Sequence, residues 1–292
     1  MNLSKRNYSK QSHVIVNARY ALTRNEIDLI LTLLTEIKKE DKDFKDYIFS
    51  IKDLEVKTSK KWQSKQLRET VKGLMSKPLE IEEKPNSWEI INWFSYFKYD
   101  NGAITCRFDK RLKPYLLEIK NRFVISDLRM ILPMRSSYSK RVYLLLKEYA
   151  KIGSRTIELS ELQEILKVPK SLKVYADFKR KVLLKAKADI DKFTDLKIDF
   201  KEKKLGKKVT SIIFTIKKND EDLKTFIQVI RELYTNQRLA FYNDKPIKCD
   251  DKGLLYYADE SMATLTKKEA QKAWEWLHEH RASLEIFQQS LF

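Results

Sequence analysis

The chain has 292 residues, of which 42% are hydrophobic and 34% are charged, and its formal net charge is +18. This length is enough for two domains and a smaller third. No apolar run is long enough to span a bilayer, and the opening residues MNLSKRNYSKQSH lack the apolar core of a signal peptide. We therefore expect a cytoplasmic protein with no membrane partner, and the two cysteines imply no disulfide framework.

The positive charge is concentrated in one segment. Residues 170–218 hold 16 Lys or Arg against 6 Asp or Glu, a net charge of +10, whereas residues 221–292 hold 10 against 12, a net charge of −2. Lys and Arg displace condensed counterions from nucleic acid, so this segment favours a polyanionic partner. A lysine-rich surface without such a partner is the alternative.

The sequence of the first half of the chain predicts a helix, a short strand, a short helix and a longer helix, in that order. Thr23 and Glu26 form a capping box at the start of the first helix. The last helix, at residues 60–76, turns apolar side chains inward and carries a weaker basic group, which could contact phosphate or remain solvated surface. These cations are Lys60, Lys61, Lys65 and Arg68.

Strand-like runs follow at residues 78–83, 87–100 and 103–108, with a hairpin signal at Asp100-Asn101-Gly102. The aromatic side chains between residues 88 and 97 are expected in the core or in a dimer interface. Residues 109–120 have a helical pattern despite Pro114.

The second half repeats this order. Ser136 or Ser137 caps a helix, residues 155–159 form a short strand, and a capping box at residues 160–163 opens a short helix. A long helix at residues 175–193 precedes two strands that pair around Leu205-Gly206. The repeat predicts an α+β protein with two tandem winged-helix domains, residues 8–132 and 133–219. Residues 220–292 are expected to form a small α/β extension, with helices near 221–235 and 266–280 around an aromatic hairpin.

The long helix is amphipathic. A period of 3.6 residues places apolar side chains on one face and cations on the other. The apolar face carries Tyr175, Phe178, Val182, Ala186 and Ile190, and the opposite face carries Lys173, Arg180, Lys181 and Lys187. A helix followed by a basic hairpin, or wing, is typical of winged-helix domains that bind double-stranded DNA in the major groove.

Catalysis has little support in the sequence. None of the five glycines lies in a phosphate-binding loop, and no carboxylate cluster has metal-ligand spacing. His278-Glu279-His280 superficially resembles the His-x-His pair of rolling-circle nickases, but its middle residue is polar and no tyrosine follows. We expect no enzyme activity, no metal and no cofactor, with a nicking initiator as a remote alternative.

Three blocks resemble the Rep initiator family of theta-replicating plasmids, whose origins carry direct repeats called iterons. These blocks are residues 14–37, residues 136–166 and residues 175–216, and they include the run SYSKRVYLLLK and the hairpin tip KKLGKKV. The resemblance implies that the second winged helix binds iteron bases, and that the first adds backbone contacts or forms a dimer. Monomers would open the origin with the host initiator and the replicative helicase. Dimers would repress their own promoter, and a dimeric repressor without a replication role is the alternative.

The family's basic positions match residues of this chain. They fall on Lys173, Lys179, Arg180 and Lys181 at the helix, and on Lys203, Lys204, Lys207 and Lys208 in the wing. Arg180 is the first candidate for base contact, because arginine–guanine pairing is the commonest specific contact. Lys179 lies nearer the edge of the apolar face and is expected to contact phosphate or to snorkel. The wing lysines are expected to contact phosphates. Lys140 and Arg141 begin a helix whose amides could receive a phosphate, or they mark a plain helix start.

Overall fold

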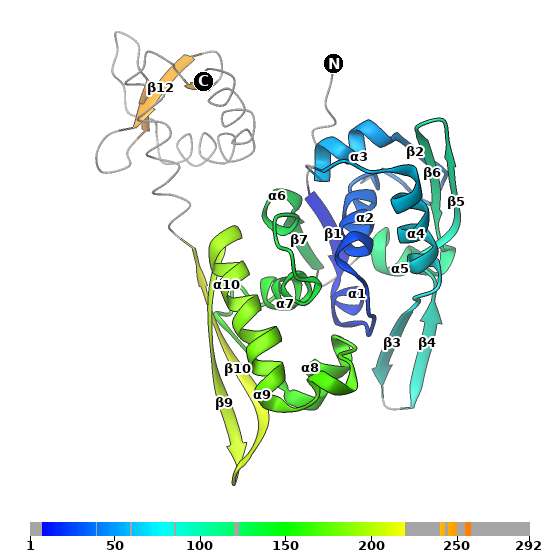
Figure 1. Ribbon diagram of the computed structural model, residues 1–292. Coiled ribbons are helices and arrows are strands. Elements are labelled where there is room, and N and C mark those ends of the chain that lie inside the picture. Colours follow the sequence, from blue (N-terminus) through cyan, green and yellow to red (C-terminus); the bar gives the residue numbers. More distant parts are fainter. Residues whose placement is uncertain are drawn as a thin grey trace. The chain divides into compact units, whose positions relative to one another are not determined.

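The computed structural model describes residues 8–219 except 39, 59, 85 and 120–122, together with three strands at 240–242, 245–249 and 255–257. The chain divides into two compact units, residues 1–219 and 220–292, and each is described by itself. The two predicted winged helices both lie in the first unit (Figure 1).

The first winged helix contains three helices and a three-stranded sheet. Its strands run in the order β2-β6-β5, so the strand that follows the first of these helices pairs with the last strand of the hairpin. The elements are α2 (Arg24–Leu34), β2 (Tyr47–Ser50), α3 (Ile51–Thr58), α4 (Ser64–Met75), β5 (Phe94–Asp100) and β6 (Ala103–Phe108).

Two local sequence signals in this part are confirmed. The Thr23 N–H donates to the Glu26 carboxylate at 2.8 Å, and the Glu26 N–H donates to the Thr23 hydroxyl at 3.4 Å, which completes the capping box. Between β5 and β6, Asn101 and Gly102 have φ angles of 45° and 87°. Two consecutive positive φ values suit the tight turn that the Asn-Gly pair predicts.

The second winged helix has the same topology, with strands in the order β8-β10-β9. The predicted structural repeat is therefore confirmed at the level of sheet order. Its elements are α7 (Ser137–Lys147), β8 (Ser154–Glu158), α8 (Leu159–Ile165), the helical segment at residues 175–193, β9 (Leu196–Leu205) and β10 (Lys208–Lys218). We call residues 175–193 the recognition helix and the β9–β10 hairpin the wing.

Several boundaries differ from the sequence prediction. The run at residues 87–100 splits into β4 (Ser87–Ile91) and β5, and β4 pairs with β3 (Leu79–Lys84) in a separate hairpin. Of residues 109–120 the structure describes all but residue 120, and these hold only the 3-10 turn η1 (Lys110–Leu112) and the four-residue helix α5 (Lys113–Leu116). Helix α8 begins at Leu159 with Glu158 as its N-cap, so the predicted cap at Ser160 is wrong.

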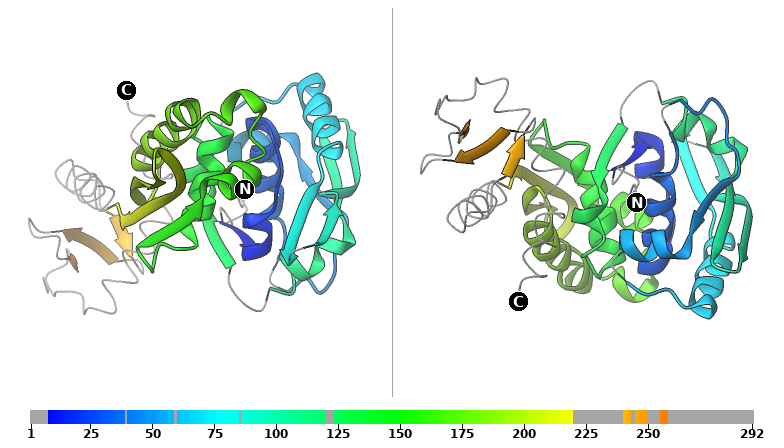
Figure 2. Two further views of the ribbon diagram at one scale, coloured as in Figure 1. Left: turned by 90° about the horizontal axis from the view of Figure 1, so that it is seen from below. Right: turned by 90° about the horizontal axis from the view of Figure 1, so that it is seen from above.

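The two winged helices share one hydrophobic core. Strand β1 (Tyr8–Ser12) pairs with β7 (Phe123–Asp127), which leads into the short helix α6 (Leu128–Ile131). Helix α1 (His13–Asn17) contacts both β3 and α7. The views in Figure 2 show the blue α1–α2 segment between the green helices of the second winged helix and the strands of the first. The predicted boundary at residue 133 falls between α6 and α7.

In the second unit, the strands described are β11 (Ala240–Tyr242), β12 (Lys245–Cys249) and β13 (Leu255–Tyr257), which form an antiparallel sheet in that order. They lie in the segment for which an aromatic hairpin is predicted. The predicted flanking helices and the His278–His280 motif lie outside the described residues.

Candidate nucleic-acid interface

The recognition helix is continuous but not uniform. It starts as α9 (Tyr175–Phe178), widens into a π-helical turn η3 (Lys179–Leu183), and continues as α10 (Leu184–Phe193). The Leu184 N–H donates to the Lys179 carbonyl, five residues back. Single π turns are frequent at functional sites, and this one coincides with the basic triplet at residues 179–181.

The predicted apolar face of this helix is buried. Phe178, Val182, Ala186 and Ile190 are all fully buried, and Tyr175 is half-buried. One further side chain lies in the core: Leu183, five residues after Phe178 and the last residue of the π turn, is also buried. This packing fixes which side of the helix faces solvent.

Arg180 and Lys181 lie on the solvent side, with 71% and 53% of their side chains exposed. Both approach the carboxylate of Asp177, one turn earlier: an Arg180 Nη2 lies 2.7 Å from Oδ1, and the Lys181 Nζ lies 3.7 Å from it. The hydrogen bond from Arg180, helped by the charge of Lys181, holds the pKa of Asp177 below its usual value. Two cations thus face solvent from one turn, with a carboxylate between them.

Lys179 points toward the wing instead. Its Nζ donates to the Glu202 carboxylate at 2.7 Å, and the Tyr175 hydroxyl donates to the same oxygen at 2.8 Å. The bonds from Lys179 and Tyr175 lower the pKa of Glu202 to about 2. This cluster ties the recognition helix to the wing, and the two elements lie side by side in Figure 1.

Lys187 is also held by protein groups. Its ammonium lies 2.9 Å from a carboxylate oxygen of Asp191 and donates to the backbone carbonyl of Ile198 in β9. Lys173, which follows the short turn η2 (Lys170–Leu172), is exposed just before the helix. Within the recognition helix, Arg180 and Lys181 thus expose more of their side chains than Lys179 and Lys187 do.

The wing carries its lysines at an exposed tip. Lys203, Lys207 and Lys208 are exposed, and Lys204 lies 3.2 Å from Glu202. Gly206 has a φ of +61°, which closes the turn between Leu205 and Lys208. A bulge between Val209 and Ser211 breaks the register next to the tip, and bulges increase local twist.

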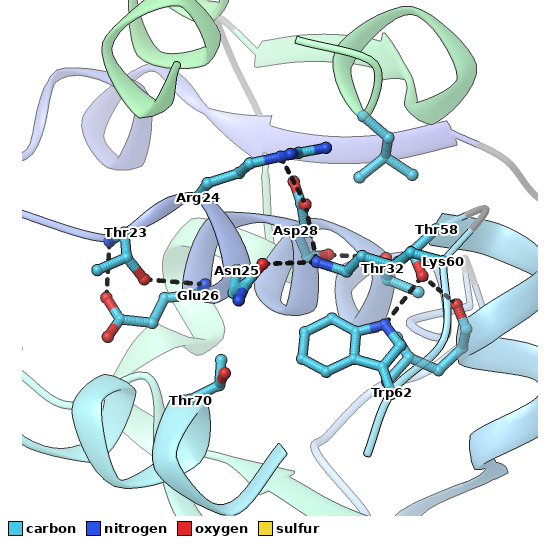
Figure 3. Close-up of polar contacts among 12 residues, drawn as sticks. Thr23, Arg24, Asn25, Glu26, Asp28, Thr32, Thr58, Lys60, Trp62 and Thr70 are labelled. Carbon is cyan, nitrogen blue, oxygen red and sulfur yellow. Dashed lines mark hydrogen bonds and ion pairs between the residues drawn. The ribbon is translucent and has the colours of Figure 1, made fainter. Parts of the chain in front are cut away.

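The first winged helix offers a second, weaker set of cations. Lys61, Lys65 and Arg68 are exposed at or near the start of α4, and Lys61 lies 3.1 Å from Glu55. Lys60 turns inward instead: its Nζ lies 2.7 Å from Asn25 Oδ1 and 3.3 Å from Asp28 Oδ2 (Figure 3). Burial lowers the pKa of Lys60, although Asp28 opposes that effect.

The prediction that Lys140 and Arg141 contact DNA is wrong for this structure. They are 0% and 3% exposed. Lys140 pairs with the buried carboxylate of Asp28 and donates to the Leu132 carbonyl at 3.2 Å. Arg141 stacks on the Tyr20 ring, with Cζ 3.6 Å from its centroid, and donates to the Ala18 carbonyl at 2.7 Å.

The amides at the start of α7 are engaged as well. The Ser139 N–H donates to the hydroxyl of Ser136, which caps the helix as predicted, and the Lys140 N–H donates to the Ser136 carbonyl. The side chains of Lys140 and Arg141 join the two winged helices. Both come from α7 of the second winged helix, and their partners Asp28, Ala18 and Tyr20 belong to the first. Burial lowers the pKa values of both Lys140 and Arg141.

The carboxylates of the site were not predicted. Asp177, Asp191 and Glu202 each hold a cation of the proposed surface. For Asp177 and Asp191 a signal was present, since acid–base pairs three or four residues apart meet on a helix surface. The Glu202 contact joins two elements and depends on their packing. Within the described residues, no group of three or more His, Cys, Asp or Glu could hold a metal ion, and no helix could cross a membrane.

Two family models match the chain. One is described as "Initiator Replication protein, WH1" and covers residues 8–147, and the other as "Initiator Rep protein, WH2" and covers residues 158–216. The chain belongs to the initiator replication protein family. The α+β fold with two tandem winged helices agrees with this assignment. Membership implies a DNA-binding protein of replication initiation.

Solved structures of domains 2 and 3 of RctB are also similar to this chain. One matches at 11% identity with a TM-score of 0.42, covering 73% of this chain and 91% of that one. A second matches at 13% identity with a TM-score of 0.39, covering 75% and 94%. These values are too low to add to the family assignment.

Proposed function

We propose that this initiator binds directly repeated origin sequences, the iterons, and that the recognition helix enters the major groove of each repeat. The observation that carries the proposal is the exposed Arg180–Lys181 pair beside a basic wing in the second winged helix. An arginine side chain presents the fork that guanine binds bidentately. The wing lysines contact phosphates and add affinity without sequence preference.

The first winged helix has a supporting role in this proposal. Lys61, Lys65 and Arg68 contact the phosphate backbone. All three are exposed, and the attraction between a cation and a phosphate does not depend on the DNA sequence. Lys173 and Lys187 do the same beside the recognition helix. The protein acts by binding and not by cutting, and recruitment of the host initiator and the replicative helicase follows on the bound DNA.

We further propose that the free protein forms a homodimer through the first winged helix. Ile48 is 71% exposed and Tyr96 is 44% exposed on the outer face of the β2-β6-β5 sheet, and β5 is an edge strand. Edge strands with exposed apolar side chains favour pairing with another chain. In this form the protein represses its own promoter, and a repressor without a replication role is the competing function.

A maintenance test separates these functions. A DNA fragment that carries the gene and its flanking sequence is joined to a selectable marker without an origin and introduced into the organism of the gene. Maintenance as a circular molecule, lost when a stop codon interrupts the gene, supports the initiator. Failure of the intact fragment, with the protein produced and its promoter repressed, would leave the repressor. A covalent tyrosine–DNA adduct on origin DNA would favour nicking.

A further inference from the structure

One apolar side chain lies among the cations of the recognition helix. Leu184 is 47% exposed, whereas its neighbour Leu183 is buried. Leu184 follows Arg180 by four residues, about one helical turn, so it lies further along the same face. Of two adjacent leucines, one belongs to the core and the other to the proposed DNA-facing surface.

The π turn accounts for this division. It places Leu183 over Phe178, five residues earlier, so that both side chains pack inward. The next residue is rotated by roughly 100° about the helix axis, and Leu184 therefore leaves the core. Arg180 lies on the same solvent side, with 71% of its side chain exposed.

The exposure of Leu184 matters because of where the residue lies on the helix. Single exposed apolar residues are common and need no explanation. In the major groove, however, the 5-methyl group of thymine is the base-edge feature that an apolar side chain contacts. An aliphatic side chain between cations on a helix that enters this groove has that methyl group as its natural partner.

We propose that Leu184 contacts the 5-methyl group of a thymine close to the guanine that Arg180 binds. Four residues of helix rise about 6 Å, and successive base pairs are about 3.4 Å apart. The thymine therefore lies within about two base pairs of that guanine. This inference rests on the proposed function and adds a T·A requirement to it.

The test removes the methyl group and the side chain separately. A bound sequence is selected with the full-length protein from a pool of random duplexes, and each thymine is replaced in turn by deoxyuridine, which lacks only the methyl group. Kd is measured for the wild type, for Leu184→Ala, and for Val56→Ala as a control. Val56 is a 60% exposed aliphatic residue on α3.

For the wild type, deoxyuridine at one position should weaken binding about three- to five-fold, the effect of one buried methyl group. Leu184→Ala should weaken binding to the unmodified duplex by a similar factor and lose all sensitivity at that position. Val56→Ala should keep the full sensitivity. Alanine favours helix, so circular dichroism of Leu184→Ala should match the wild type.

Two results would overturn the inference. One is a Leu184→Ala protein that keeps the full deoxyuridine penalty, and the other is a wild type that no deoxyuridine affects. In either case, if binding to the selected sequence still requires Arg180, the proposed function is not contradicted. If no sequence is selected at all, the proposed function fails together with this inference.

Discussion

In helix α7 the adjacent cations Lys140 and Arg141 are buried, whereas in the recognition helix of the same domain Arg180 and Lys181 expose most of their side chains. Both are adjacent cations in the first part of a helical segment, and as sequence they look alike. The first pair binds Asp28 and the Tyr20 ring across the boundary between the winged helices. The difference shows that a basic pair can join two domains or face solvent, and that the packing of its helix decides which.

The largest expected effect comes from the buried pair. Lys140→Met should lower the free energy of unfolding by about 3 kcal/mol, because it leaves the buried carboxylate of Asp28 without its closest partner. Urea unfolding measures this. The exposed Lys61→Ala should change it by less than about 0.5 kcal/mol. If Lys140→Met keeps its stability but binds DNA more weakly, the structural role of Lys140 would be contradicted and a DNA contact supported.

The exposed pair should behave in the opposite way. Arg180→Ala should weaken binding to the selected sequence by about 1–3 kcal/mol and leave binding to random DNA nearly intact. Its stability should match the wild type, since 71% of the side chain is exposed. Fluorescence anisotropy on both duplexes measures the two affinities. Equal losses on both would exclude a base contact.

The wing should contribute through salt-dependent contacts. Lys207→Ala combined with Lys208→Ala should reduce the slope of log K against log salt by about two without changing the preferred sequence. Titration at several salt concentrations gives this slope. The double variant Lys61→Ala and Lys65→Ala tests the proposed phosphate contacts of the first winged helix by the same slope. An unchanged slope would remove the wing tip from the phosphate contacts.

A smaller effect should appear at low pH. The pKa of Glu202 is about 2, below its ordinary 4.5, because Lys179 and Tyr175 bond to its ionised form. The stability that this carboxylate contributes is therefore present above pH 4.5 and is lost as the pH falls toward 2. NMR titration of the carboxyl group should show the low pKa, and Lys179→Met should raise it. A Glu202 pKa near 4.5 in the wild type would break the proposed tie between helix and wing.

Much of the fold could be predicted from local sequence. The capping box at Thr23, the turn at Asn101-Gly102 and the apolar stripe of the recognition helix each depend on residues close in the chain. The β3–β4 hairpin and the π turn could not be predicted, because strand pairing and a widened turn depend on distant packing. The same limit applies to the site. The exposed position of Arg180 could be predicted from helical periodicity, whereas the burial of Lys140 depends on Asp28, 112 residues earlier in the chain.

The most direct measurement is a DNase footprint of the purified protein on the DNA that flanks its gene, with the wild type beside Arg180→Ala. The proposal predicts a ladder of protected sites in direct repeat, regularly spaced, that the variant fails to protect. A single inverted-repeat protection over the promoter, with none elsewhere, would contradict iteron binding and leave a repressor.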